Sequence, residues 1–182
     1  MPRPKRIQLA GAVYHISTQA NRTEALYLDA IDYRTFFSFV GLVAERHELE
    51  LHAWCAMTTH YHLLFTTRND DLAAAMHRLN SRYAHWWNDV HGAEGHVFRR
   101  RYTAVLVETE EHLKWCYRYI AMNPVKAGIC DRPELWRWSS FAWLFGGGHR
   151  VELRSGERQL FRHFGEDDAA RMRLRRYVET GL

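Results

Sequence analysis

Residues 49 to 67 constrain the fold most, because a strand-like alternation there is followed, after a short break, by a second strand-like stretch. Residues 49 to 57 place every second side chain on one face, as a half-buried strand does. Thr58 and Thr59 form the break, and residues 60 to 67 continue as the second strand. Strands joined by so short a connection pair antiparallel, so this segment predicts two neighbours in an antiparallel sheet.

The rest of the chain predicts two more strands and three helices. β-Branched and aromatic residues mark strands over residues 13–18 and 101–108. Apolar residues at helical spacing predict helices over residues 32–48, 71–90 and 109–122. The order β, α, β, β, α, β, α predicts an α+β domain, with an antiparallel sheet and helices packed mainly on one face.

Length and composition fit one domain followed by an extension. A chain of 182 residues can bury a sizeable hydrophobic core in one domain. After three consecutive glycines, at positions 146 to 148, the composition becomes strongly charged. This change predicts a domain over residues 1–145 and a charged C-terminal extension over residues 146–182.

The sequence favours a protein of the cytoplasm with no membrane partner. No apolar run is long enough to span a bilayer, and the N-terminus lacks the apolar segment of a signal peptide. The cysteines, Cys55, Cys116 and Cys130, have no C-x-x-C spacing and fit reduced, mostly buried thiols.

The distribution of positive charge indicates an anionic partner. The formal net charge is +4, and a pI of about 9.1 is only moderately basic. Basic residues gather in three clusters: Arg3, Lys5 and Arg6; Arg99, Arg100 and Arg101; and Arg171, Arg173, Arg175 and Arg176. Phe98 and Tyr102 flank the second cluster, and aromatic rings beside cations suit single-stranded nucleic acid. A solvated charged face is the alternative for each cluster.

His60 and His62 form the first candidate site. Residues two apart in a strand point to the same side, so both imidazoles lie together while Tyr61 faces away. Two adjacent imidazoles can bind a metal and leave room for a third ligand and for substrate. Two histidines on a wet sheet face are the alternative.

The helix predicted over residues 109–122 carries the second candidate site. Thr109 is its expected N-cap, and Asn123 before Pro124 is expected to end it. Tyr117 belongs to the apolar stripe, whereas Tyr119 lies off it, with Asn123 on the same flank as Tyr119. Asn123 could supply a third metal ligand or cap the helix end, and Tyr119 could be an aromatic at the edge of the core.

A tyrosine near a metal site suggests phosphodiester chemistry. A tyrosine hydroxyl, with an ordinary pKa of about 10, can attack a phosphodiester that a divalent cation polarises. The covalent step would conserve the phosphodiester energy, so rejoining would need no ATP. The chain has no P-loop, which agrees with the absence of a nucleotide cofactor.

Several stretches resemble the small single-tyrosine HUH transposases, and most closely the REP-associated tyrosine transposases. The stretches that carry the resemblance are Arg3–Ile7, Gly11–Ile16, Leu51–Phe65, Gly95–Phe98, Tyr119–Gly128 and Trp136–Phe141. Their order and spacing, over about residues 3 to 145, are far more specific than an H-x-H triplet alone.

The resemblance implies a ferredoxin-like, HUH nuclease-type core and an enzyme that cleaves and rejoins single-stranded DNA. His60, His62 and Asn123 become ligands of Mg²⁺ or Mn²⁺, and Tyr119 becomes the nucleophile that forms a 5′-phosphotyrosine. The implied partner is hairpin DNA of the REP palindrome type. Candidates for DNA contact are Arg3, Lys5, Arg6, Arg22, Arg99, Arg100 and Arg101, and a monomer is favoured weakly over a homodimer.

One departure keeps a second function open. The family usually has Pro-Asn before the H-x-H, where this chain has Thr58 and Thr59, and an altered turn could tilt His60. The alternative is therefore a non-catalytic DNA-binding protein with the same fold. A phosphodiesterase that activates water is a third reading, disfavoured because the sequence offers no convincing acidic metal cluster.

Overall fold

The computed structural model describes residues 9–21, 25–151 and 157–182, and its elements follow the predicted order. The strands are β1 (Val13–Gln19), β2 (Glu50–Ala56), β3 (His60–Thr66) and β4 (Thr103–Val107). The α-helices are α1 (Ala30–Arg46), α2 (Leu72–His91), α3 (Glu110–Lys126), α4 (Ser140–Phe145) and α5 (Ala170–Thr180). Short 3-10 helices are η1 (Pro133–Leu135), η2 (Glu157–Leu160) and η3 (Arg162–Phe164).

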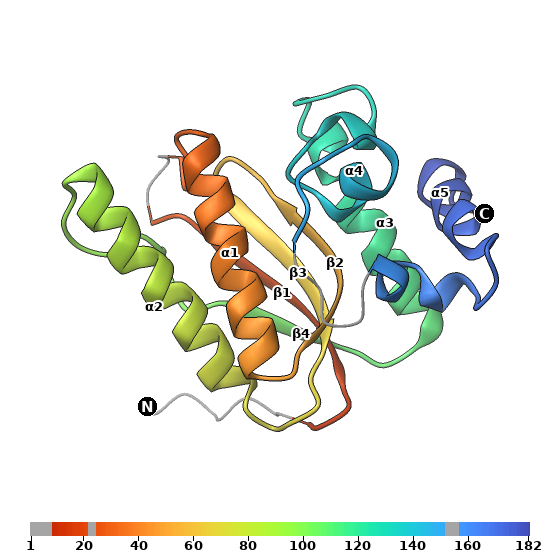
Figure 1. Cartoon of the computed structure of the whole chain (residues 1–182), viewed down its shortest axis with the longest axis horizontal. Coiled ribbons are helices and arrows are strands. Elements are labelled where there is room, and N and C mark those ends of the chain that lie inside the picture. The colour runs from red at the N-terminus through yellow and green to blue at the C-terminus, as the bar shows by residue number, and fades with distance from the viewer. Residues whose placement is uncertain (1–8, 22–24, 152–156) are drawn as a thin grey trace.

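The four strands form one antiparallel sheet in the order β2-β3-β1-β4. With the element order β1-α1-β2-β3-α2-β4, this is the ferredoxin-like topology, so the predicted fold class is confirmed (Figure 1). The register places Ser17 of β1 opposite both His62 of β3 and Thr103 of β4. Directly opposed residues point to the same face, so these three side chains share one side of the sheet.

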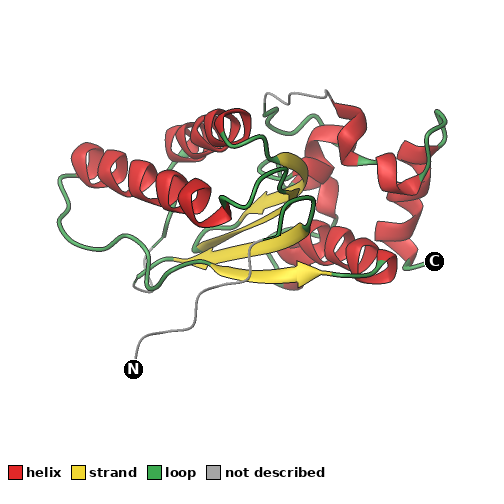
Figure 2. Cartoon of the chain, turned by 90° about the horizontal axis from the view of Figure 1, so that it is seen from below, coloured by secondary structure: helices red, strands yellow, loops and turns green. Residues whose placement is uncertain are grey.

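The helices divide between the two faces of the sheet. α1 and α2 lie along one face (Figure 2), where Phe36 of α1 packs against Tyr61 with ring centroids 4.7 Å apart. The next residue on β3, His62, points to the opposite face and contacts Tyr119 of α3. The prediction of helices mainly on one face thus holds for α1 and α2, while α3 covers part of the other face.

The prediction that α3 ends before Pro124 is wrong. The helix continues through Pro124, which is buried, to Lys126. The chain then leaves the helix at Ala127, whose backbone N–H donates to the carbonyl of Asn123 at 3.0 Å. A proline lacks one N–H donor, and burial of its ring against the core compensates for the lost bond. The extra turn keeps Lys126 on the same helix as Tyr119.

The C-terminal extension shares the core of the residues before it. Gln159 donates from its side chain to the carbonyl of Leu51 at 2.7 Å, beside an irregularity in β2 between Leu51 and Ala53. Phe164 packs edge-on against Tyr117 of α3, and Leu174 and Val178 of α5 are buried. Residues after 146 therefore cover the β2 edge and one flank of α3. None of the described helices combines the length and apolarity needed to cross a membrane.

Candidate active site on the open face of the sheet

His60 and His62 lie together on the sheet face that α1 and α2 leave uncovered. Both belong to β3, and alternation along the strand turns their imidazoles to the same side, with ring centroids 5.1 Å apart. His15 of β1 projects from the same face, and its ring centroid lies 5.1 Å from that of His62. Three imidazoles therefore meet across two neighbouring strands.

The Nδ1 atoms of His60 and His62 each have a hydrogen-bond partner. Nδ1 of His60 lies 3.2 Å from the hydroxyl of Thr59. Nδ1 of His62 lies 3.0 Å from Nε2 of His15. When each Nδ1–H donates to its partner, each Nε2 keeps its lone pair, which is the tautomer that a metal ligand requires.

The Thr58-Thr59 turn is anchored by backbone hydrogen bonds and contacts His60. The carbonyl of Thr58 accepts from the N–H of Leu26 at 2.7 Å, and that of Thr59 accepts from the N–H of Ala20 at 2.8 Å. The Thr59 hydroxyl contacts His60 as described above. A threonine at position 59 thus supplies a side-chain contact to the histidine that follows it.

Asn123 closes the site from α3. Its amide nitrogen lies 3.3 Å from Nε2 of His62, and its side chain also hydrogen-bonds His60. If the side-chain amide of Asn123 flips, Oδ1 takes the place of Nδ2. Asn123 can then offer an oxygen beside two imidazole nitrogens. The described residues contain no cluster of three or more His, Cys, Asp or Glu side chains suited to a metal. Two histidines and this amide are thus the donor set that the site offers.

The environment keeps the site's imidazoles neutral. Burial lowers the pKa of His15 to about 4, and repulsion from His112 adds to the effect. Burial, followed by the nearby His15 and His60, holds the pKa of His62 well below its ordinary value. Burial also lowers the pKa of His60, against a hydrogen bond to the Asn123 side chain that raises it. Neutral imidazoles have the lone pairs that bind metal ions.

Tyr119 projects from α3 into this group of histidines. Thr109 caps the helix by accepting from the N–H of His112 at 3.1 Å, as the sequence predicts. The Tyr119 ring meets those of His62 and His15 edge-on, at centroid distances of 5.4 and 5.7 Å. Trp115, one turn earlier, stacks on Tyr119 at 4.9 Å, and Nζ of Lys126 lies 5.4 Å from the ring centroid.

A pocket of about 250 Å³ opens beside the nucleophile candidate. It is lined by Ser17, Thr18, Gln19, His60, His62, Arg100, Arg101, Thr103 and Tyr119. Arg100 and Arg101 are exposed, and within the described residues no carboxylate lies within ion-pair distance of either guanidinium. The pocket thus brings two free cations to the histidines and the tyrosine. Its walls suit a phosphate-bearing strand.

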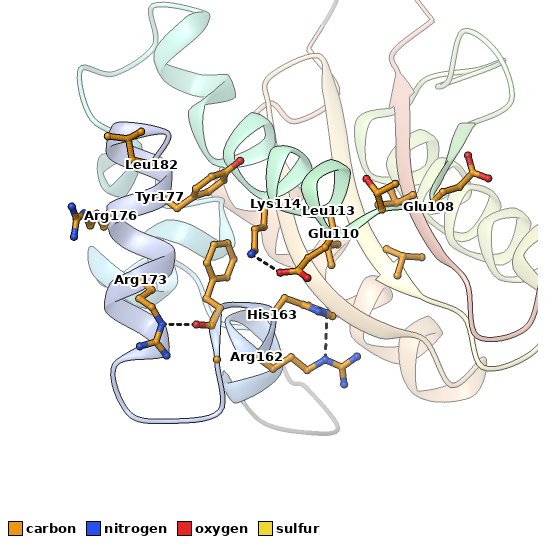
Figure 3. A pocket seen from close by; sticks show the side chains of 15 residues that line it. Glu108, Glu110, Leu113, Lys114, Arg162, His163, Arg173, Arg176, Tyr177 and Leu182 are labelled. Atoms are coloured by element: carbon orange, nitrogen blue, oxygen red, sulfur yellow. Dashed lines mark hydrogen bonds and ion pairs between the residues drawn. The ribbon is translucent and has the colours of Figure 1, made fainter.

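The predicted DNA-contact residues divide into two groups. Arg100 and Arg101 line the pocket, whereas Arg99 is exposed but does not line it. Arg3, Lys5, Arg6 and Arg22 lie outside the described residues. A larger pocket, on the flank of α3 that faces the extension, contains none of the predicted site residues (Figure 3).

The structure adds four residues that the sequence interpretation did not assign to the site. His15 and Trp115 contact Tyr119, Lys126 lies near its ring, and Thr59 contacts His60. Alternation in the first strand could have placed His15 on an outward face, but only the β1–β3 register brings it to His62. Lys126 was missed because the helix was expected to end before Pro124.

Comparison with known proteins agrees with this geometry. Residues 9–123 match the profile of the family described as "Transposase IS200 like". A search of curated proteins finds no significant match. A solved REP-associated tyrosine transposase, bound to a REP hairpin, superposes with a TM-score of 0.69 at 17% identity, covering 84% of this chain and 99% of that chain. At this identity the likeness shows a shared fold.

A second solved structure is more distant. It is a tRNA(His) guanylyltransferase from Saccharomyces cerevisiae, which matches at a TM-score of 0.46 and 10% identity, covering 99% of this chain and 82% of that chain. A likeness this weak carries no argument about function.

Proposed function

This chain belongs to the IS200-like transposase family, and from that membership we propose that it cleaves and rejoins single-stranded DNA beside hairpins, with Tyr119 as nucleophile. The observation that carries the proposal is the position of Tyr119. Its ring meets His62 and His15 edge-on, and it lines a pocket with Arg100 and Arg101, neither of which has a carboxylate partner among the described residues. Tyr119 also packs against the edge of the core, but a packing role alone does not explain the arginines and histidines around it.

The proposed reaction exchanges one phosphodiester for another. The Tyr119 hydroxyl loses its proton and its oxygen attacks phosphorus, forming a 5′-phosphotyrosine. The bond from phosphorus to the 3′ oxygen breaks, and that oxygen takes up a proton to leave a free 3′-OH. Attack by a 3′-OH on the phosphotyrosine reverses these changes and rejoins the strand. One phosphodiester is present throughout, so no ATP is consumed.

We further propose that His60, His62 and Asn123 hold a divalent cation, Mg²⁺ or Mn²⁺. The donor set fits, because Nε2 of His62 lies beside the Asn123 amide, which also hydrogen-bonds His60 and can present its oxygen next to the two imidazoles. Such a cation would polarise the phosphate and stabilise the leaving oxygen. With only three protein donors, coordination positions remain for phosphate oxygens of the DNA.

The proposed partner is hairpin DNA with a single-stranded flank. Support comes from the solved relative, which is bound to a REP hairpin, and from Arg100 and Arg101 at the pocket. These guanidinium groups can contact phosphate oxygens without first breaking an ion pair.

A covalent-trapping assay tests the proposal. Purified protein is incubated with Mn²⁺ and labelled single-stranded hairpins from the DNA that flanks its gene, and the products are separated on a denaturing gel. We expect a labelled band at the combined mass of protein and DNA, absent with Tyr119→Phe. A native-gel shift without any adduct would favour the non-catalytic DNA-binding alternative. Cleavage that persists in Tyr119→Phe would favour hydrolysis by water.

A further inference from the structure

Trp115 is exposed beside the proposed nucleophile. It lies on α3 one turn before Tyr119, and 51% of its surface is accessible to solvent. One face of its ring stacks on Tyr119, with the planes inclined by 16°. A flat ring with one face covered and half its area exposed leaves its other face open to solvent.

β4 presents a second exposed apolar residue on the sheet face that carries His15. Val105 of β4 is 43% exposed and pairs with His15, whose ring also meets Tyr119. His112, half-buried, lies with its ring centroid 6.2 Å from that of Trp115. Tyr119 therefore has an open aromatic and apolar surface next to it, in addition to the polar pocket.

The cations near Tyr119 complement this surface. Arg100 and Arg101 line the polar pocket, and Nζ of Lys126 lies on the Tyr119 ring. In the part of the chain that the structure describes, no carboxylate pairs with any of the three. A ligand that joins a flat apolar ring to an anionic group, as a nucleotide does, satisfies both kinds of surface at once.

We propose that Trp115 is the stacking platform for an unpaired nucleobase next to the scissile phosphate. This inference rests on the proposed function and adds a nucleobase subsite to it. A base that stacks on the open face of Trp115 would hold the adjoining phosphate within reach of Tyr119. A base in a duplex has both faces covered by its neighbours, so the subsite selects single-stranded DNA. Every base has a π-face, so the subsite tolerates different sequences.

Base fluorescence provides the test. The protein carries Tyr119→Phe, which prevents cleavage and keeps a ring for Trp115 to stack on. The probes are hairpins with a single-stranded flank from the DNA around the gene, each with 2-aminopurine at one position of the flank. A duplex of the same flank serves as the control ligand, and Ile31→Ala, at an exposed residue on α1, is the control variant.

We expect fluorescence quenching at one or two adjacent flank positions. Trp115→Ala should abolish this quenching and weaken hairpin binding by about tenfold, or about 1.4 kcal/mol, which is within the range that stacking of one base contributes. Trp115→Phe, which keeps an aromatic ring, should restore most of both effects, and Ile31→Ala should change neither.

Three results would overturn the inference. Unchanged quenching and affinity in Trp115→Ala would show that no base stacks there. Equal weakening for hairpin and duplex would show that Trp115 does not select unpaired bases. If Tyr119→Phe binds no hairpin at all, the proposed DNA partner itself fails, which separates that failure from a failure of the stacking platform.

Discussion

The two flanks of α3 border two pockets that differ in size and in the state of their charges. Lys114 and Tyr119 are five residues apart, which places them roughly 140° apart around the helix. On the Lys114 side, facing the extension, the pocket measures about 950 Å³ (Figure 3). On the Tyr119 side, facing the open sheet, it measures about 250 Å³. The larger pocket contains none of the residues that the sequence assigns to the site.

The two pockets also differ in how many of their cations are paired with carboxylates. In the larger pocket Lys114 pairs with Glu110 at 2.5 Å, Arg162 with Glu50, and Arg173 with Asp167. Among the lysines and arginines that line it, Arg176 alone has no carboxylate partner within the described residues. In the smaller pocket, neither Arg100 nor Arg101 has a carboxylate partner in the described part of the chain. Among the described residues, the smaller pocket therefore has two arginines without a carboxylate partner, against one in the larger pocket, and it has them beside His60 and His62.

Substitution of a candidate metal ligand should give the largest difference in cleavage rate between variants on the two flanks of α3. His60→Ala should lower the cleavage rate roughly 100-fold or more, because a metal supplies several kcal/mol of transition-state stabilisation. His163→Ala, in the larger pocket, should leave cleavage within a few-fold of wild type. Single-turnover cleavage and Mn²⁺ titration calorimetry measure both variants. Equal cleavage rates for the two variants would show that His60 does not bind a catalytic metal on the sheet face.

Substitution of His15 should give the next largest effect. His15→Ala removes the acceptor of the His62 Nδ1–H, and loss of such a partner lowers metal affinity by about 10- to 100-fold. His15→Gln offers a carbonyl oxygen in its place and should retain most of the affinity. Calorimetry measures the Mn²⁺ affinity of both variants. If His15→Gln binds Mn²⁺ as weakly as His15→Ala does, His15 does not position His62 through this hydrogen bond.

The free arginines should matter for DNA binding more than the paired cations do. Arg100→Ala with Arg101→Ala should weaken hairpin binding by roughly tenfold and reduce the salt dependence, because each lost phosphate contact lowers the slope by about 0.7 for single strands. Lys114→Ala with Arg173→Ala should change little, since both cations are already paired. Fluorescence anisotropy at several KCl concentrations provides the comparison. The same salt slope in both double variants would contradict it.

Acid should lower the stability of the folded protein through its buried histidines, on the extension side as well as on the sheet face. Burial, with repulsion from His163 and Arg162, lowers the pKa of His52 to about 3. Below a pKa of about 6.5 the unfolded chain binds a proton that the folded protein does not, so stability falls as pH decreases. For this histidine the loss from pH 7 to pH 6 is about 0.7 kcal/mol.

Urea unfolding at both pH values measures this loss. His52→Gln should show a correspondingly smaller dependence of its unfolding free energy on pH than wild type does. An identical dependence in the two proteins would mean that His52 titrates normally in the folded state.

The sequence predicted those parts of the fold that depend on local pattern. Strand alternation brought His60 and His62 to one face, and helical spacing separated Tyr119 from the buried Tyr117. The order of the elements was sufficient for the α+β class. The two placements of side chains succeeded because each depends on the backbone geometry of a single element.

The contacts that complete the site depend on pairings that no local pattern contains. His15 reaches His62 through the register of β1 with β3, between residues 47 positions apart. Lys126 reaches Tyr119 because α3 continues through Pro124, where tertiary packing overrides the local preference to end. The packing of the extension on Tyr117 is likewise a long-range contact that its charged composition conceals.

The most direct test of the account identifies the residue that carries the DNA. Trypsin cuts after Lys114, Arg118 and Lys126, so it separates Tyr117, in the peptide Trp115–Arg118, from Tyr119, in the peptide Tyr119–Lys126. The trapped adduct is digested with nuclease and trypsin, and mass spectrometry locates the remaining nucleotide. We expect the nucleotide on the peptide Tyr119–Lys126, attached to Tyr119. A nucleotide on any other peptide, or cleavage that leaves no modified peptide, would contradict it.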